Sequence, residues 1–222
     1  VRAGVTTAEI DRAAQELILL SGGEPSFKQV AGYKHAVCIT VNEQVVHGLP
    51  TNYKLQDKDI VGIDVGLNFR GWHTDTAVTV AVEAVDKQTA RFLATGRQSL
   101  ADAVNAAREG AIIWDISHAM EKPIMAAGFA PVRSLTGHGI GKQLHEEPQI
   151  PCFTFGERDK SVKLTAGMCL AIETIYNQGS FEVIYGEDNW TISTADGKLS
   201  AMFEVTVAIT STGAKVLTPL VV

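Results

Sequence analysis

The sequence contains little cysteine and no long apolar segment. Its three cysteines, Cys38, Cys152 and Cys169, lie far apart, and an odd number of distant thiols is typical of a reducing compartment rather than of a disulfide framework. No apolar run reaches the roughly 18 residues that span a bilayer, and the first four residues lack a signal-peptide pattern. We expect a soluble, cytoplasmic protein without a membrane segment.

Positive charge is also scarce. Lys and Arg total 19 against 25 Asp and Glu, which gives a formal net charge of -6, and no basic run is present. This balance disfavours binding to nucleic acid or to anionic lipid. With 45% hydrophobic residues in a chain of 222, a substantial core can form, and we expect one domain over residues 1–222. The chain enters a helix cap soon after Val1, so we expect that it lacks a short N-terminal segment.

The spacing of apolar residues predicts helices and strands in alternating groups. Helical spacing occurs in three segments: from a capping box at Thr6 and Glu9 to Gly22, from Thr89 to Arg108, and from near Asp115 to limits at Pro123 and Gly128. Strands rich in Val, Ile and Thr are predicted within residues 36–46, 60–82 and 165–210. A hairpin turn is predicted at residues 68–71, inside the second strand segment.

The two halves of the chain contain a similar pattern of residues. In each half a histidine precedes a proline by three residues, a Lys-Leu pair follows, and an acid stands nine residues after that leucine. These acids are Asp64 and Glu173, and each is followed by a second strand acid, Asp75 or Glu204. An internal duplication around one shared site is the simplest account. Chance similarity between Val-rich strands does not explain why acids and histidines recur in step.

Asp64 lies in an otherwise apolar strand, where a lone ionised carboxylate is costly. If the hairpin turns at the centre of residues 68–71, Asp64 and Asp75 are equally far from the turn and face each other. Two facing carboxylates repel unless cations or a shared proton hold them. Two metals or a protonated dyad are therefore the physical choices for this pair.

Further acids favour metal over the dyad. Glu173 and Glu204 also lie in strands that otherwise read as core, and His138 is flanked by glycines that let the backbone approach a site closely. Carboxylates in excess with one imidazole suit Mn, Fe or Co, and Zn is also compatible. The sequence therefore predicts a divalent metal site built from several strands.

The motifs that carry these residues resemble those of type I methionine aminopeptidases, within the pita-bread metallopeptidases. The matching segments run over nearly the whole chain: Val45 to Pro50, Asp64, Trp72 to Thr76, Gly137 to Gly141, His145 to Pro148, Glu173 and Glu204. The resemblance implies an α+β pita-bread (creatinase/aminopeptidase-like) fold with a pseudo-two-fold internal duplication. A curved antiparallel sheet would surround the metals, with helices outside.

The resemblance also implies a role for each site residue. Two divalent metals (Co, Mn, Fe or Zn) would be held by Asp64, Asp75, His138, Glu173 and Glu204. Glu173 would also shuttle a proton. His47 and His145 would act in catalysis and substrate binding, as donors that polarise the carbonyl and stabilise the tetrahedral intermediate.

The pocket for the leaving methionine should be apolar with room for one unbranched side chain. The resemblance nominates Tyr33, Cys38 and Trp190 as its walls, and Cys38 is interpreted as pocket lining rather than as a nucleophile. The chain departs from the family pattern near this pocket at Val30, Ala31 and Leu144, and near the ligands at Thr174 and Val205. His73 shares the strand face of Asp75 and is expected to have a supporting role, whereas His35 and His118 are expected at the surface.

By this resemblance the chain removes the initiator methionine from nascent proteins and peptides when the second residue is small. It would act as a monomer, with the ribosome as a candidate partner. Proline-specific relatives, the Xaa-Pro aminopeptidases and dipeptidases, share the fold but usually carry a large extra N-terminal domain. A non-catalytic peptide-binding module is a third possibility, although such relatives usually lose ligands. Type I is favoured over type II because only 31 residues separate Glu173 from Glu204.

Overall fold

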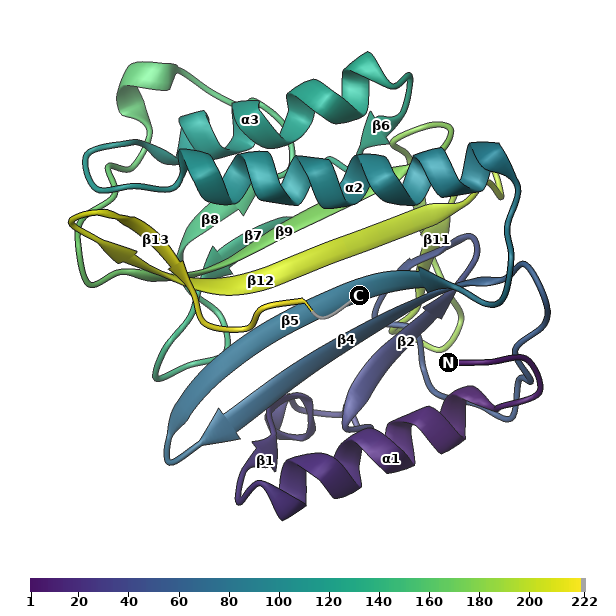
Figure 1. Ribbon diagram of the computed structural model, residues 1–222. Helices are drawn as coiled ribbons and strands as arrows, with labels where there is room; N and C mark the ends of the chain where they lie inside the picture. Colours follow the sequence, from purple (N-terminus) through teal and green to yellow (C-terminus); the bar gives the residue numbers. More distant parts are fainter. Residues whose placement is uncertain (221–222) are drawn as a thin grey trace.

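The computed structural model describes residues 1–220, which form one large antiparallel sheet, a smaller sheet and three α-helices (Figure 1). The helices are α1 (Thr7–Leu20), α2 (Lys87–Ala106) and α3 (Ile113–Ala126), with 3-10 turns η1 (Ser26–Gln29) and η2 (Arg158–Lys160). None of the helices formed by residues 1–220 has the length and apolar character needed to cross a bilayer.

The main sheet has a central path of strands in the order β1-β4-β5-β12-β9-β7-β8. Its strands are β1 (Glu24–Pro25), β2 (Val37–Val41), β4 (Ile60–Phe69), β5 (Trp72–Ala81), β6 (Ala130–Pro131), β7 (Thr136–Gly139), β8 (Glu146–Pro151), β9 (Cys169–Asn177), β12 (Ser200–Thr210) and β13 (Gly213–Val216). The smaller sheet contains β3 (Gln44–Val46), β10 (Val183–Tyr185) and β11 (Ile192–Thr194). Strand pairs from the first and second halves of the chain therefore meet where β5 pairs with β12.

Helix α1 begins where the sequence predicts it, whereas α2 and α3 each begin two residues before the predicted Thr89 and Asp115. The Thr6 side chain accepts a hydrogen bond from the backbone of Glu9 at 3.1 Å, and the Glu9 carboxylate accepts one from the backbone of Thr6 at 2.7 Å. The prediction that Pro123 limits the third helix is wrong, because α3 continues to Ala126. A proline removes one backbone hydrogen bond, but here the buried side chains of Met120 and Ile124 keep that turn packed into the core.

The predicted pairing of Asp64 with Asp75 is also wrong. The hairpin closes at Phe69 and Trp72, so Asp64 pairs with Ala77, and Asp75 pairs with Gly66. The two-residue turn uses positive φ at both Arg70 (54°) and Gly71 (80°), which is the turn geometry that matches the twist of paired strands. Residues 68 and 69 remain in the strand, so the true centre lies one residue later than predicted.

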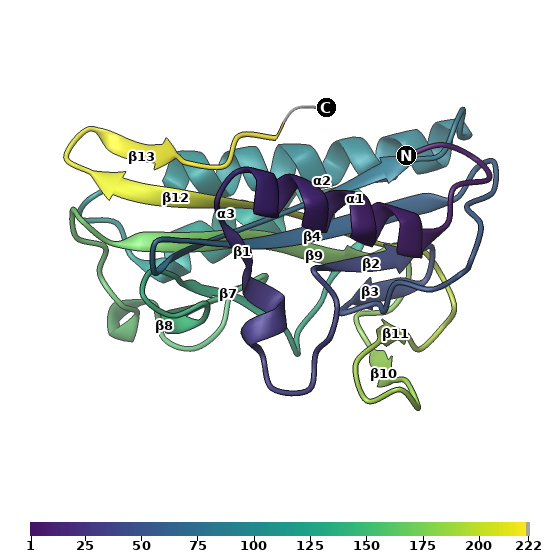
Figure 2. The same ribbon diagram turned by 90° about the horizontal axis from the view of Figure 1, so that it is seen from below.

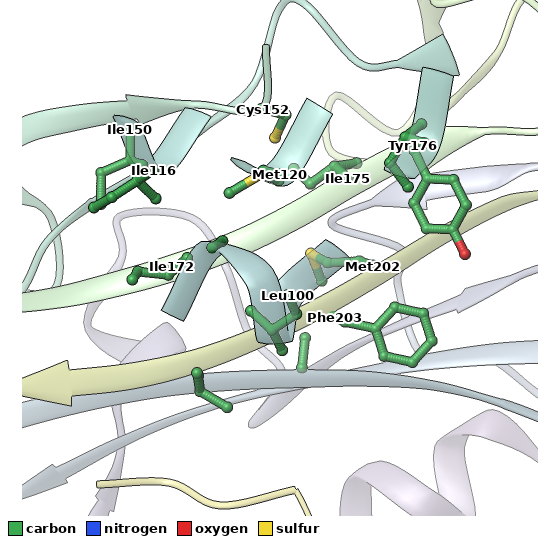
Figure 3. Packing of buried hydrophobic residues seen from close by; sticks show 14 of the residues in the cluster. Leu100, Ile116, Met120, Ile150, Cys152, Ile172, Ile175, Tyr176, Met202 and Phe203 are labelled. Atoms are coloured by element: carbon green, nitrogen blue, oxygen red, sulfur yellow. The ribbon is translucent and has the colours of Figure 1, made fainter. Parts of the chain in front are cut away.

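The helices pack against one face of the sheet. Helix α2 packs on β9 and β12, with α3 beside it over β6 and β8, and Tyr176 and Phe203 lie fully buried in the core that also contains Met120 and Leu100 (Figure 3). At the other end of the sheet, α1 lies along β2 and β4 (Figure 2). Because alternate strand residues point to opposite faces, the residues between these core positions point away from the helices. The acids predicted as ligands occupy those positions.

Candidate metal centre and active site

Three of the predicted acids lie in a single row across the middle of the sheet. Asp64 on β4 pairs with Ala77 on β5, Ala77 pairs with Glu204 on β12, and Glu204 pairs with Glu173 on β9. Side chains of directly paired residues point to the same face. Asp64, Glu204 and Glu173 therefore project together from the face opposite the helices, with only the small Ala77 between them.

Asp75 and His138 belong to the next row. Asp75 lies two residues before Ala77 on β5, and its backbone exchanges hydrogen bonds of 2.8 Å with the side chain of Thr206, two residues after Glu204. His138 on β7 pairs with Ala171 of β9. Ligand atoms of Asp75, His138 and Glu204 lie within 4.8 Å of one another. The structure thus brings all five predicted ligands to one face, over two adjacent rows.

The four carboxyl groups crowd together without an opposing basic side chain in the ion pairs of residues 1–220. Burial, followed by the charges of Asp75 and Glu173, raises the pKa of Asp64 well above its usual range. Burial raises the pKa of Asp75 to about 7, and burial together with Asp75 raises that of Glu173 to about 8. The pKa of Glu204 is raised by burial and then by the same neighbours. These are the shifts expected of acids gathered in a buried site, where a divalent cation would stabilise their charged forms.

Two further observations fit a divalent cation at this position. One carboxylate oxygen of Asp64, Oδ1, is buried and has no hydrogen-bond partner within residues 1–220, although such groups are rarely left unpaired. His138 donates from Nδ1 to the carbonyl oxygen of Gly139 at 2.8 Å, since a carbonyl can only accept. Its Nε2 lone pair is therefore free, and burial lowers the pKa of His138 to about 4. A neutral, oriented imidazole is the form that binds metal.

The glycines beside His138 have a different role from the predicted one. A Cβ at Gly137 would lie 2.6 Å from the Ala171 carbonyl oxygen, and a Cβ at Gly139 would lie 2.2 Å from that of Glu147. The glycines let β7 fit closely between β8 and β9. They therefore position His138 through strand packing rather than by opening the backbone to a ligand.

The two other predicted catalytic histidines stand at the edge of the ligand group. His145 has its ring centre 4.5 Å from that of His138, and His47 follows β3 with a positive φ of 56°. Restricted solvation lowers the pKa of both residues, with further lowering of His47 by His145. Both residues line the cavity and keep part of their surface exposed. They are thus neutral side chains that can each offer one N–H and one lone pair to a bound molecule.

A cavity of about 150 Å³ adjoins the ligands. It contains the predicted walls Tyr33, Cys38 and Trp190, with the Tyr33 and Trp190 rings edge to face at 4.9 Å. Of the departures from the family pattern, Val30 and Leu144 line this cavity. It also has three apolar walls that the sequence analysis missed: Phe27, Val46 and Met202. Met202 could have been found from strand alternation, because it lies two residues before Glu204.

The remaining histidines lie outside this cavity. His73 bonds through Nδ1 to the Ser26 hydroxyl at 2.9 Å and through Nε2 to the Asn68 amide at 3.1 Å. It thereby ties η1, which carries the cavity wall Phe27, to the β4–β5 hairpin. His118 is exposed, as predicted, whereas His35 is half-buried and lies 3.5 Å from Asp11.

Known proteins share both the sequence and the fold. Residues 1–211 match the model of metallopeptidase family M24. The chain is 43% identical to a methionine aminopeptidase of Clostridium perfringens, over 98% of this chain and 87% of that relative. Its structure is similar to that of a methionine aminopeptidase from Thermotoga maritima, with a TM-score of 0.95 and 38% identity over 99% of this chain and 88% of the other.

A prolidase from Pyrococcus furiosus is similar in fold alone. Its TM-score is 0.79 at 22% identity, and the similarity covers 100% of this chain and 58% of the prolidase. The predicted pita-bread fold, an α+β arrangement with a large antiparallel sheet, is confirmed by these similarities.

Proposed function

This chain belongs to metallopeptidase family M24, and from that premise we propose that it removes methionine from the N-terminus of peptides whose second residue is small. The single observation that carries the proposal is the ligand group beside a small apolar cavity. Such a cavity holds one side chain, and the ligands lie next to it. The names of its relatives, methionine aminopeptidases, support the same substrate.

Use of divalent metal follows from the family. We propose that two ions, Co, Mn, Fe or Zn, are held by Asp64, Asp75, His138, Glu173 and Glu204. When bound, such ions supply a Lewis acid for the scissile carbonyl and lower the pKa of water toward neutrality. Carboxylate oxygens with one imidazole nitrogen suit hard and borderline cations, and the unpaired oxygen of Asp64 supports a ligand at its end of the row.

The chain's own side chains would supply proton transfer and positioning. Glu173, which lies at the end of the row, would accept a proton from the attacking water and pass it to the leaving amine. His47 and His145 would donate from their neutral rings to the carbonyl oxygen as it gains negative charge. Tyr33, Cys38 and Trp190 would hold the methionine side chain and exclude water from it.

The test compares three peptides with metal-stripped protein that has been reloaded with Mn. Methionine should be released from Met-Ala-Ser, and much more slowly from Met-Lys-Ser because its second residue is large. Ala-Pro-Ala should remain uncut. Cleavage of Ala-Pro-Ala would move the chain to the proline-specific relatives, whose fold it shares, and bound metal without any turnover would favour a peptide-binding module.

We also propose a cytoplasmic monomer that meets its substrates as nascent chains near the ribosome. The three cysteines are free thiols, which suits a reducing compartment. Sedimentation at micromolar concentration should give the mass of one chain, 23.8 kDa. Co-sedimentation with translating ribosomes tests the second part, and equal recovery with and without ribosomes would contradict it.

A further inference from the structure

A polar groove of about 620 Å³ continues from the catalytic cavity. His138 and His145 line both spaces, so the groove begins at the ligand group and at a proposed carbonyl donor. Its other walls come from the loop after β7 and from the outward side of β8, including Lys142, Glu147 and Gln149. A peptide with its first side chain in the apolar cavity could therefore extend its remaining residues into this groove, because the two spaces share His138 and His145.

A second space, here called the outer groove, continues from the polar groove. It measures about 640 Å³ and shares Glu147 and Gln149 with the polar groove. Its remaining walls come from the start of α3, the end of β8 and the segment around η2, and include Trp114, Ser117 and Phe155. The two grooves therefore form one track along β8, away from the metal ligands.

Two side chains of the polar groove, Glu147 and Gln149, are available to bind another molecule. The Glu147 carboxylate and the Gln149 amide make no hydrogen bond or ion pair with the part of the chain that the structure describes. Lys142 stands over the Trp72 ring at 3.9 Å, and the Glu146 carboxylate accepts a bond from the Gln143 backbone. The uncommitted charge in the middle of the track is thus the negative charge of Glu147.

The outer groove offers both apolar and polar contacts. Phe155 is 73% exposed and Val162 is 48% exposed, and both line this groove, so together they give it apolar surface. The Ser117 hydroxyl oxygen is buried in the wall of this groove and has no hydrogen-bond partner within residues 1–220. A polypeptide, with its alternating amides and side chains, matches a surface of this mixed kind.

We propose that this track binds the substrate polypeptide beyond its second residue, and that Glu147 favours a basic side chain there. The proposal rests on the proposed aminopeptidase function and adds to it a binding surface for the substrate residues beyond the second. An extended peptide rises roughly 3.3 Å per residue, so a chain alongside the six residues of β8 would place about six residues on the track.

Peptide length is the first test. Methionine release from Met-Ala-Ser is compared with release from Met-Ala-Ser-Lys-Ser-Leu-Gly-Ser. We expect kcat/KM of the octapeptide to exceed that of the tripeptide by about tenfold, since contacts with the track add binding energy. Equal values for the two peptides would overturn the proposal.

Charge is the second test, with Lys or Glu placed in turn at positions 3 to 6 of the octapeptide. At one or more positions the Lys peptide should be favoured about three- to tenfold, as expected of a partly exposed charge pair. The preference should disappear in Glu147→Gln and reverse in Glu147→Lys. The control Glu16→Lys changes an exposed charge on α1, at the far side of the molecule from β8 (Figure 1), and should keep the original ratio. If the preference for the Lys peptide over the Glu peptide is the same in the Glu147 variants as in the original chain, the proposal is contradicted.

A binding measurement separates failure of the track from failure of the proposed function. Fluorescently labelled Ala-Ser-Lys-Ser-Leu-Gly-Ser, which lacks methionine, is titrated into metal-stripped protein. It should bind the original chain and the Glu16→Lys control alike, and about threefold or more weakly in Glu147→Lys. If no peptide releases methionine but this pattern of binding holds, the aminopeptidase function fails and the track stands. If methionine is released but the labelled peptide binds all variants equally, the track fails.

Discussion

The two halves of the sheet supply matching acids in different registers. On β9 and β12, Glu173 and Glu204 are directly opposite each other. On β4 and β5, Asp64 and Asp75 are displaced by two residues. Strands β4 and β5 are joined by a tight two-residue turn, whereas β9 and β12 are joined through β10 and β11. A repeated motif therefore identifies which residues meet, but the connection between the strands determines how they meet.

The displaced register has a consequence for the metals. Glu204 pairs directly with both Ala77 and Glu173, so it lies between the two halves. Asp64 lies at the end of the same row, outside the close group of Asp75, His138 and Glu204. The acids of the two halves are thus unequal in their distance from the centre of the ligand group.

The largest effect is expected from the central acid. Glu204→Gln should abolish binding of both ions and lower kcat/KM more than about a thousandfold, because even outer-shell partners of a metal are worth about 10- to 100-fold. Asp64→Asn should keep one ion on the remaining close group. Bound Mn per chain, measured by elemental analysis after dialysis, checks this. If both variants lose metal equally, the proposed difference between the central Glu204 and Asp64 at the end of the row is contradicted.

The position between Asp64 and Glu204 gives the second prediction. Ala77 is 1% exposed and points to the ligand face, so Ala77→Leu would fill the space between the two acids. Affinity for Mn should fall about 100-fold, comparable to loss of a strong supporting contact. The neighbouring Val78→Leu points to the helix side and serves as the matched control. Calorimetric titration measures both, and unchanged affinity in Ala77→Leu would contradict the row arrangement.

The third prediction concerns pH and the metal-free protein. In the unfolded chain Asp75 and Glu173 are ionised at neutral pH, but the folded protein holds protons until their raised pKa values of about 7 and about 8 are passed. Below those values the folded state binds more protons than the unfolded chain, so its stability should fall as pH rises from about 6.5 to about 8 and level off above that. His138, with its pKa lowered to about 4, is neutral in both states over most of this range. Calorimetric Tm in EDTA should drop by several degrees, and less in Glu173→Gln, while added Mn should reverse the trend. A Tm that rises with pH over this range in the metal-free protein would contradict the prediction.

The smallest effect compares the cores behind the two halves. Ile116 on α3 is fully buried in the large core behind β9 and β12, while Ile10 on α1 is half-buried against β2 and β4. Ile116→Val should cost about 1 kcal/mol of unfolding free energy, and Ile10→Val about half as much or less. Urea unfolding of both variants measures the difference. A larger cost at Ile10 would mean that the smaller core dominates stability.

The residues of the site could be identified from the sequence alone, but their arrangement in space could not. Acids such as Asp64 and Glu204 are conspicuous in apolar strands, and a histidine between glycines is equally visible. The register was not accessible, because Arg70 takes a positive φ that non-glycine residues seldom adopt. Continuation of α3 past Pro123 likewise depends on tertiary packing, which local propensity does not include.

The track along β8 was not accessible from sequence either. Glu147 was noted only as part of a motif, and Trp114 and Phe155 were not singled out. They become one surface only when α3 and η2 fold against β8. Surfaces built from distant segments carry no local periodicity, so the sequence gives no signal for them.

The most direct test of the account is a titration of Mn into metal-free protein, with bound metal and methionine release from Met-Ala-Ser measured in the same samples. The account predicts no release without metal and release that rises with occupancy of the five-ligand group, with both lost in Glu204→Gln. Full binding of Mn by the original chain without any release of methionine would contradict it.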